Sequence, residues 1–217
     1  RSWFAQQSTN GFVGGLQRFG DRYCCMDKIV MWLKIAVSCL PAMLIGLPLN
    51  DWLDKHFYNP TVVALMLLLY GAGFLFVERY NRSRKPRVNS IAALRWSDAL
   101  LIGVFQVLAL IPGTSRSGAT ILGGILIGTS REVAAEYTFF LAVPVMFGAS
   151  LLKIVKFGAI SGTELGVLLV GMAVAFGVSI LAIRFLMGYI RKHDFTAFGW
   201  YRIGLGLLVL LYFYVIR

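Results

Sequence analysis

Composition and charge exclude most classes of protein for this chain. It has 217 residues, of which 58% are hydrophobic and only 14% are charged, whereas about 25% of the residues in soluble domains are charged. A folded domain of this length has too little interior to bury so much apolar surface, so a soluble enzyme, a disordered tail and a disulfide-stabilised secreted domain are excluded. The sequence therefore predicts an integral membrane protein.

The net charge of +11 fits this prediction. The basic residues gather between apolar runs, where they set membrane topology and contact anionic lipid head groups, so they do not indicate nucleic-acid binding. Cys24, Cys25 and Cys39 show neither metal-ligand spacing nor a disulfide framework. Residues 1–28 form a basic segment without the pattern of a signal peptide.

Five apolar runs are long enough to cross a bilayer, which takes about 20 residues of helix. Two of them precede a basic segment, residues 78–97, whose arginines and lysine assign it to the cytoplasm. The other three follow at residues 131–217. In chain order the predicted spans are residues 29–49, 61–77, 133–152, 165–183 with a helix continuing to 190, and 198–216.

Residues 99–130 carry one charge, Arg116, and contain the helix-breaking pair Pro112-Gly113. They form either one long kinked span or a hairpin of two half-helices that enters and leaves on the same side. Both models place the same number of basic residues on the cytoplasmic side, so the distribution of charge does not decide between them. Each arm would be about 18–20 Å long, too short to span alone, whereas one continuous helix would reach about 48 Å. We therefore predict a hairpin over residues 98–130.

The break between the arms concentrates polar groups at membrane depth. It offers several hydroxyls, backbone N–H groups at the start of the second arm, and the guanidinium of Arg116. A helix N-terminus favours an anion, and an arginine fork matches phosphate oxygens. The two interpretations are an oxyanion site, most simply for phosphate, and a helix break solvated by water and neighbouring carbonyls.

A few polar residues outside the break have ordinary interpretations. Glu136 is expected in the first turn of its helix, where an acid complements the helix dipole. Lys34 is intramembrane by position and can snorkel to the interface. Gln106 lies two turns before the break, within reach of it. His56 and His193 are expected to be loop histidines, with metal ligation as the alternative.

The string PGTSRSGAT at residues 112–120 closely resembles the second signature region of bacterial undecaprenyl-diphosphatases. FQVLALI precedes it, and a glycine-rich arm and SREVAAEYTFFLAVPVMFGAS follow it. The resemblance runs from Lys34 to the C-terminus and includes Tyr201-Arg202-Ile203.

This resemblance implies an all-α, polytopic inverted-repeat fold of the cytoplasmic membrane, with about five spanning helices and re-entrant hairpins that meet at the active site. It implies hydrolysis of undecaprenyl diphosphate, a polyprenyl lipid, to the monophosphate and inorganic phosphate, a step in peptidoglycan synthesis linked to bacitracin resistance. Arg116 would grip the diphosphate as the catalytic arginine. The oxygens of the diphosphate would be contacted by Ser115, Ser117 and Thr120, and Ser115 would also be catalytic. Gly113 would let the backbone approach closely.

The chain departs from the family at its other signature, a Glu-x-x-x-Glu stretch leading into Pro-x-Ser-Ser-Thr-Gly-His, which has no match here. Since the chain also begins at Arg1, we interpret it as lacking the first hairpin and expect it to hold half of the site. The resemblance allows a divalent cation, Mg²⁺ or Ca²⁺, but its carboxylate ligands are not found in this chain. It also allows a homodimer. The alternative functions are a carrier or flippase for polyprenyl phosphates, or an inactive fragment.

Overall fold

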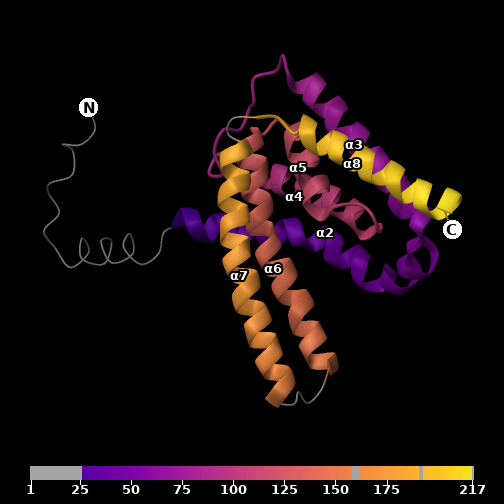
Figure 1. Cartoon of the computed structure of the whole chain (residues 1–217). Helices are drawn as coiled ribbons and strands as arrows, with labels where there is room; N and C mark the ends of the chain where they lie inside the picture. The colour runs from indigo at the N-terminus through magenta and orange to yellow at the C-terminus, as the bar shows by residue number, and fades with distance from the viewer. Residues whose placement is uncertain (1–25, 158–161, 191–192, 217) are drawn as a thin grey trace, which may run out of the picture.

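The computed structural model describes residues 26–157, 162–190 and 193–216, and regular structure within these ranges is helical (Figure 1). This confirms the predicted all-α class. The elements are α2 (Met26–Phe57), α3 (Pro60–Asn81), α4 (Trp96–Val107), the 3₁₀-helix η1 (Leu108–Leu110), α5 (Arg116–Ile127), α6 (Arg131–Phe157), α7 (Gly162–Ile190), α8 (Thr196–Leu211) and the π-helical turn η2 (Tyr212–Ile216).

Five of these helices are long and apolar enough to cross a membrane, as predicted. Their spanning segments are Lys28–Leu49, Pro60–Asn81, Arg131–Val155, Gly162–Ile190 and Thr196–Val215. Two details differ from the prediction. α2 continues to Phe57 in spite of its two internal prolines. α6 begins at Arg131, so its first-turn acid is Glu132 and the placement of Glu136 in that turn is wrong.

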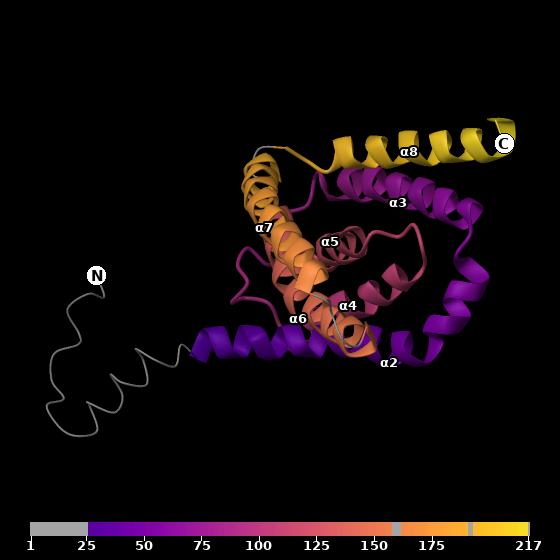
Figure 2. The same ribbon diagram turned by 60° about the horizontal axis from the view of Figure 1, so that its bottom comes forward.

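α4 and α5 are half-helices that lie between α3 and α2. In Figure 2, α8, α3, α5, α4 and α2 follow one another from top to bottom, and each neighbouring pair is in contact. Backbone hydrogen bonds close the base of the hairpin: the N–H of Arg87 (2.8 Å) and of Val88 (3.1 Å) donate to the Gly128 carbonyl, and the N–H of Ser130 donates to the Val88 carbonyl (2.9 Å). Because the chain enters α4 and leaves α5 at one end, the hairpin is confirmed and the single kinked span is excluded.

α2 fixes the start of this hairpin through polar contacts. The ammonium of Lys34 is buried and donates to the Leu94 carbonyl at 2.6 Å, so it does not snorkel to solvent. The Ser38 hydroxyl donates to the Ala99 carbonyl at 2.6 Å. The two backbones nearly touch, since a Cβ on Gly103 would lie 2.3 Å from the Ser38 carbonyl oxygen. Close approach at small residues is the usual way in which helices pack in a membrane.

α6 and α7 run side by side and extend away from the hairpin (Figure 1). The most apolar stretch of α7 buries none of its residues against the rest of the described chain, and the buried residue of this helix is Ile190 at its end. Apolar side chains such as Leu181 and Phe185 remain exposed along it. This surface has the character expected of a helix that faces lipid.

Candidate active site

The tip of the hairpin is a tight turn that the sequence dictates. The Thr114 N–H donates to the Ile111 carbonyl at 3.1 Å, with Pro112 and Gly113 between them. Gly113 has φ +89°, as the third position of a type II turn requires. A Cβ there would lie 2.6 Å from the Val63 carbonyl oxygen. The close approach predicted at Gly113 is therefore made to α3, and an approach to substrate stays a prediction.

The tip lies far from the basic end of the molecule. Val63, which it contacts, is about 27 Å along α3 from Asn81, at the helical rise of 1.5 Å per residue. The basic segment and the base of the hairpin lie at the Asn81 end, where Arg87 and Val88 pair with Gly128 and Ser130. The polar groups of the motif thus lie nearer to the opposite end of the molecule.

α5 begins at the tip, and some of its first backbone N–H groups have no acceptor among the described residues. Ser115 is the N-cap, and its Oγ accepts from the Gly118 N–H at 3.2 Å and lies 3.0 Å from the Ser117 Oγ. In the described part of the chain, no acceptor takes the N–H of Arg116 or Ser117. Two backbone donors, two hydroxyls and a half-buried guanidinium therefore gather in one helical turn, with the geometry of an anion site.

Thr120 is placed differently from the other motif hydroxyls. Its side chain is 1% exposed. Its hydroxyl donates to the carbonyls of Arg116 (3.0 Å) and Ser117 (3.2 Å), and accepts from the Thr138 hydroxyl of α6 (2.9 Å). Thr120 thus holds the first turn of α5 in place against α6. The direct contact with substrate that the resemblance implies for it stays a prediction.

A second guanidinium, that of Arg202 in α8, reaches the same helical turn. A Cβ on Gly118 would lie 3.2 Å from Arg202 Nη2, so a glycine at this position makes room for the side chain. The Cζ of Arg202 lies 5.7 Å from the centroid of the Phe74 ring. The sequence offered two signals for Arg202, namely its position inside the last span and its place in the Tyr201-Arg202-Ile203 string. Neither indicated that α8 brings this side chain close to the motif.

Several buried polar atoms around the tip have no hydrogen-bond partner in the described part of the chain. They are Gln106 Oε1 in the last turn of α4, Thr114 Oγ1 in the turn itself and Arg202 Nη1; Thr129 Oγ1, at the hairpin base, is a fourth. Buried polar groups without partners are rare in folded proteins, and they are expected to bind water or a ligand. Three of these four atoms lie on segments that form or contact the tip, so water or a polar ligand is expected there.

The electrostatics of the tip favour an anion. Among the described residues, no carboxylate forms an ion pair with Arg116 or Arg202. The ion pairs that do form, Arg87–Asp98 and Arg131–Glu78, lie at the base of the hairpin. An unpaired arginine at membrane depth is costly unless an anion binds it. Two of them at one helix N-terminus therefore favour an oxyanion site over a merely hydrated helix break.

The described residues do not fit a resident metal ion. No group of three or more His, Cys, Asp or Glu side chains comes together in the ranges that the structure describes. The tip presents guanidinium groups and hydroxyls, whereas Mg²⁺ and Ca²⁺ prefer carboxylate and carbonyl oxygens. His56 bonds the Trp52 carbonyl at 2.9 Å, and His193 stacks on Tyr189 at 4.5 Å. Both contacts are those of ordinary helix-end and loop histidines.

Comparison with known proteins agrees with the motif. Residues 2–208 match the family described as "Bacitracin resistance protein BacA". Proteins named undecaprenyl-diphosphatase are similar over most of this chain. One from Acetivibrio thermocellus is 59% identical over 192 residues, 88% of this chain and 71% of that protein. One from Clostridium acetobutylicum, named undecaprenyl-diphosphatase 1, is 54% identical over 199 residues, 91% of this chain and 73% of that protein.

A third relative, an undecaprenyl-diphosphatase from Desulfitobacterium hafniense, is 58% identical over 189 residues, 86% of this chain and 68% of that protein. The match includes the hairpin, its tip and the spans around them, since the family model extends through α2 to most of α8. The chain therefore belongs to the BacA family of bacitracin resistance proteins.

Proposed function

We propose that this chain hydrolyses undecaprenyl diphosphate to undecaprenyl phosphate and inorganic phosphate, and so recycles the lipid carrier of peptidoglycan synthesis. Membership of the BacA family and the names of its similar relatives support this activity. The five apolar spanning helices fit a multi-pass membrane protein. Its expected location is the bacterial cytoplasmic membrane, which would hold such a lipid substrate.

One observation carries the proposal: Arg202 of α8 reaches the first turn of α5, which Arg116 opens, and neither arginine has a carboxylate partner among the described residues. A diphosphate carries several negative charges and many acceptor oxygens. The Arg116 fork suits two oxygens of one phosphate, and Arg202 adds a second cation from another helix. The N–H groups of Arg116 and Ser117 and the hydroxyl of Ser117 complete the donor set.

The same groups serve catalysis by stabilising charge. In hydrolysis, water adds to the terminal phosphorus, the bridging P–O bond breaks, and the lipid phosphate leaves with the bonding electrons. Negative charge develops on the equatorial and leaving oxygens, where preorganised donors lower the barrier. In the described part of the chain no His or carboxylate hydrogen-bonds to Ser115. A nucleophilic role for Ser115 stays a prediction, as do a divalent cation and a homodimer.

The test is phosphate release from undecaprenyl diphosphate by the purified protein in proteoliposomes. We expect phosphate to appear in step with undecaprenyl phosphate, and release to fall when Arg202 is changed to Ala. A carrier is the second candidate, because a half-helix N-terminus aimed at an anion also occurs in transporters. Transfer of intact lipid between leaflets without phosphate release would support the carrier and contradict the phosphatase.

A further inference from the structure

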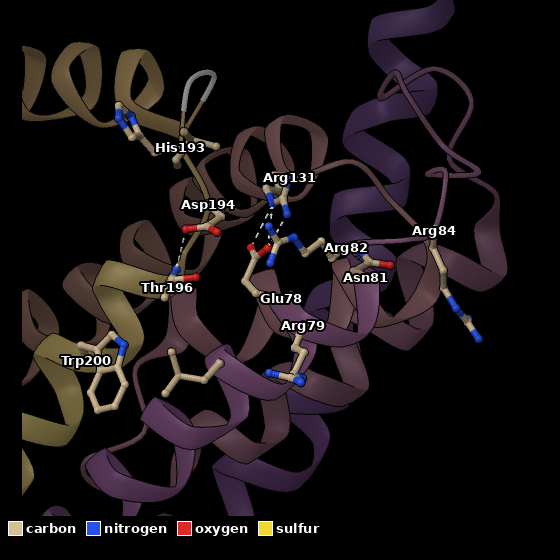
Figure 3. A pocket seen from close by; sticks show the side chains of 12 residues that line it. Glu78, Arg79, Asn81, Arg82, Arg84, Arg131, His193, Asp194, Thr196 and Trp200 are labelled. Carbon is tan, nitrogen blue, oxygen red and sulfur yellow. Dashed lines mark hydrogen bonds and ion pairs between the residues drawn. The ribbon is translucent and has the colours of Figure 1, made fainter.

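A second polar site lies at the base of the hairpin, away from the tip. The C-terminal end of α3, the first residue of α6 and the start of α8 surround an open pocket of about 820 Å³ (Figure 3). Four arginines and two carboxylates line it: Arg79, Arg82, Arg84, Arg131, Glu78 and Asp194. The pocket shares no lining residue with the tip, so the proposed function does not use it.

The carboxylates of this pocket are already occupied by the protein. Glu78, only 5% exposed, accepts from Arg131 Nε at 2.9 and 3.0 Å and from the Phe195 N–H at 3.1 Å. Asp194 accepts from the Thr196 N–H at 3.2 Å. Glu78 thus neutralises Arg131 and holds it against α3. Asp194 accepts only a backbone N–H and keeps its negative charge, so the four arginines of the pocket still outnumber its two carboxylates.

Arg79 and Arg82 belong to this excess of positive charge. Both side chains are exposed, and no carboxylate of the described ranges pairs with either. Figure 3 shows Arg82 reaching toward the Glu78–Arg131 pair, whereas Arg84 points away. Arg84 instead stacks on Tyr80, with Cζ 4.1 Å from the ring centroid. The pocket thus presents the Arg82 guanidinium beside the fixed Arg131, with Arg79 elsewhere on its lining, and this basic lining suits a phosphate group.

The position of the pocket points to a lipid as the source of that phosphate. It lies where α3 ends and α6 and α8 begin, at the basic end that charge assigns to the cytoplasm. Trp200, 62% exposed, stands at its edge, as an aromatic side chain does at the membrane–water interface. Leu75 of α3 also lines the pocket and places apolar surface beside the basic groups. Basic pockets between spanning helices on this side of a membrane suit anionic head groups.

We propose that this pocket binds the phosphate of an anionic phospholipid from the cytoplasmic leaflet. Arg79 and Arg82 contact the phosphate oxygens, Arg131 is held in place by Glu78, and the acyl chains lie along the apolar surface of α3 and α8. Because α3, α6 and the start of α8 all line the pocket, a bound lipid stabilises their packing. The site is separate from the hairpin tip and does not depend on the proposed hydrolysis.

The test measures thermal unfolding of the delipidated protein in a neutral detergent, with phosphatidylglycerol, phosphatidylcholine or inorganic phosphate added separately. We expect phosphatidylglycerol to raise the unfolding temperature at saturation, and phosphatidylcholine and inorganic phosphate to leave it unchanged. The double variant Arg79→Gln/Arg82→Gln should bind phosphatidylglycerol about tenfold or more weakly, since each arginine donates charge-assisted hydrogen bonds. Both residues are exposed, so the variant is expected to fold.

The matched control is Arg84→Gln/Lys85→Gln, which removes the same charge from the segment just after α3. Arg84 points away from the pocket, and Lys85 does not line it. Its affinity should stay within about twofold of the wild type, because long-range attraction alone contributes little at physiological salt. An equal loss in the control, or equal stabilisation by phosphatidylcholine, would overturn the proposal. Stabilisation by inorganic phosphate alone would assign the site to a free anion and would also overturn it.

Discussion

Replacing Arg116 with Ala should nearly abolish phosphate release from undecaprenyl diphosphate. Arg116 opens α5, where two backbone N–H groups lack an acceptor in the described chain. A bidentate fork supplies two charge-assisted hydrogen bonds, each contributing about 1.5–3 kcal/mol. Their loss amounts to about 3–6 kcal/mol, which corresponds to about 10²- to 10⁴-fold in kcat/KM.

Arg116→Lys should recover only part of this loss, because an ammonium keeps the charge but cannot form the planar fork. The assay is phosphate release in detergent at several substrate concentrations, so that kcat and KM are obtained separately. Arg184→Ala is the matched control, since Arg184 lies on the exposed surface of α7. Its activity should equal that of the wild type. Activity of Arg116→Ala within about threefold of the wild type would refute the reasoning.

Three further predictions follow from the geometry of the hairpin and its base. Arg202→Ala should lower kcat/KM by about tenfold or more, with partial recovery in Arg202→Lys, because its guanidinium adds charge-assisted donors at the same helical turn; wild-type kinetics would exclude Arg202 from the site. Gly113→Ala should lower both stability and activity, since its φ of +89° and the 2.6 Å approach to the Val63 carbonyl oxygen leave no room for a Cβ. Gly148→Ala is its control, because nothing lies within 4 Å of a Cβ there; equal effects of the two changes would contradict the turn geometry. Glu78→Gln should lower the unfolding temperature, since buried Glu78 bonds half-exposed Arg131 and the Phe195 N–H, and a hydrogen bond to a charged group contributes about 1.5–3 kcal/mol; an unchanged temperature would show that the pair contributes nothing.

Much of the fold could be predicted from local features of the sequence. The spans follow from the length of apolar runs, and the hairpin follows from Pro112-Gly113 together with two arms too short to cross a bilayer. Pro112 ends the first arm and Gly113 supplies the positive φ of the turn. Ser115 then caps α5 through the Gly118 N–H. Each of these features acts within a few residues, which is why they can be read without a structure.

The candidate site could be predicted only in part, because its assembly depends on helix packing. Sequence alone identified Arg116 and its neighbouring serines, but it treated Thr120 as their equivalent. The helical period instead turns Thr120 toward Thr138 of α6. Arg202 lies in a helix far along the chain, and no local pattern indicates that α8 brings it to Gly118. Lys34 was misjudged for the same reason, since the Leu94 carbonyl that binds it belongs to another segment.

The central claim is that the hairpin tip is the diphosphate site. Its most direct test is an experimental structure of the protein with a methylene-bridged analogue of the lipid diphosphate, which cannot be hydrolysed at the bridge. We predict that its phosphonate groups lie between Arg116 and Arg202, with oxygens about 3 Å from the N–H groups of Arg116 and Ser117. An analogue bound elsewhere at saturation, with the tip filled by water alone, would contradict the account.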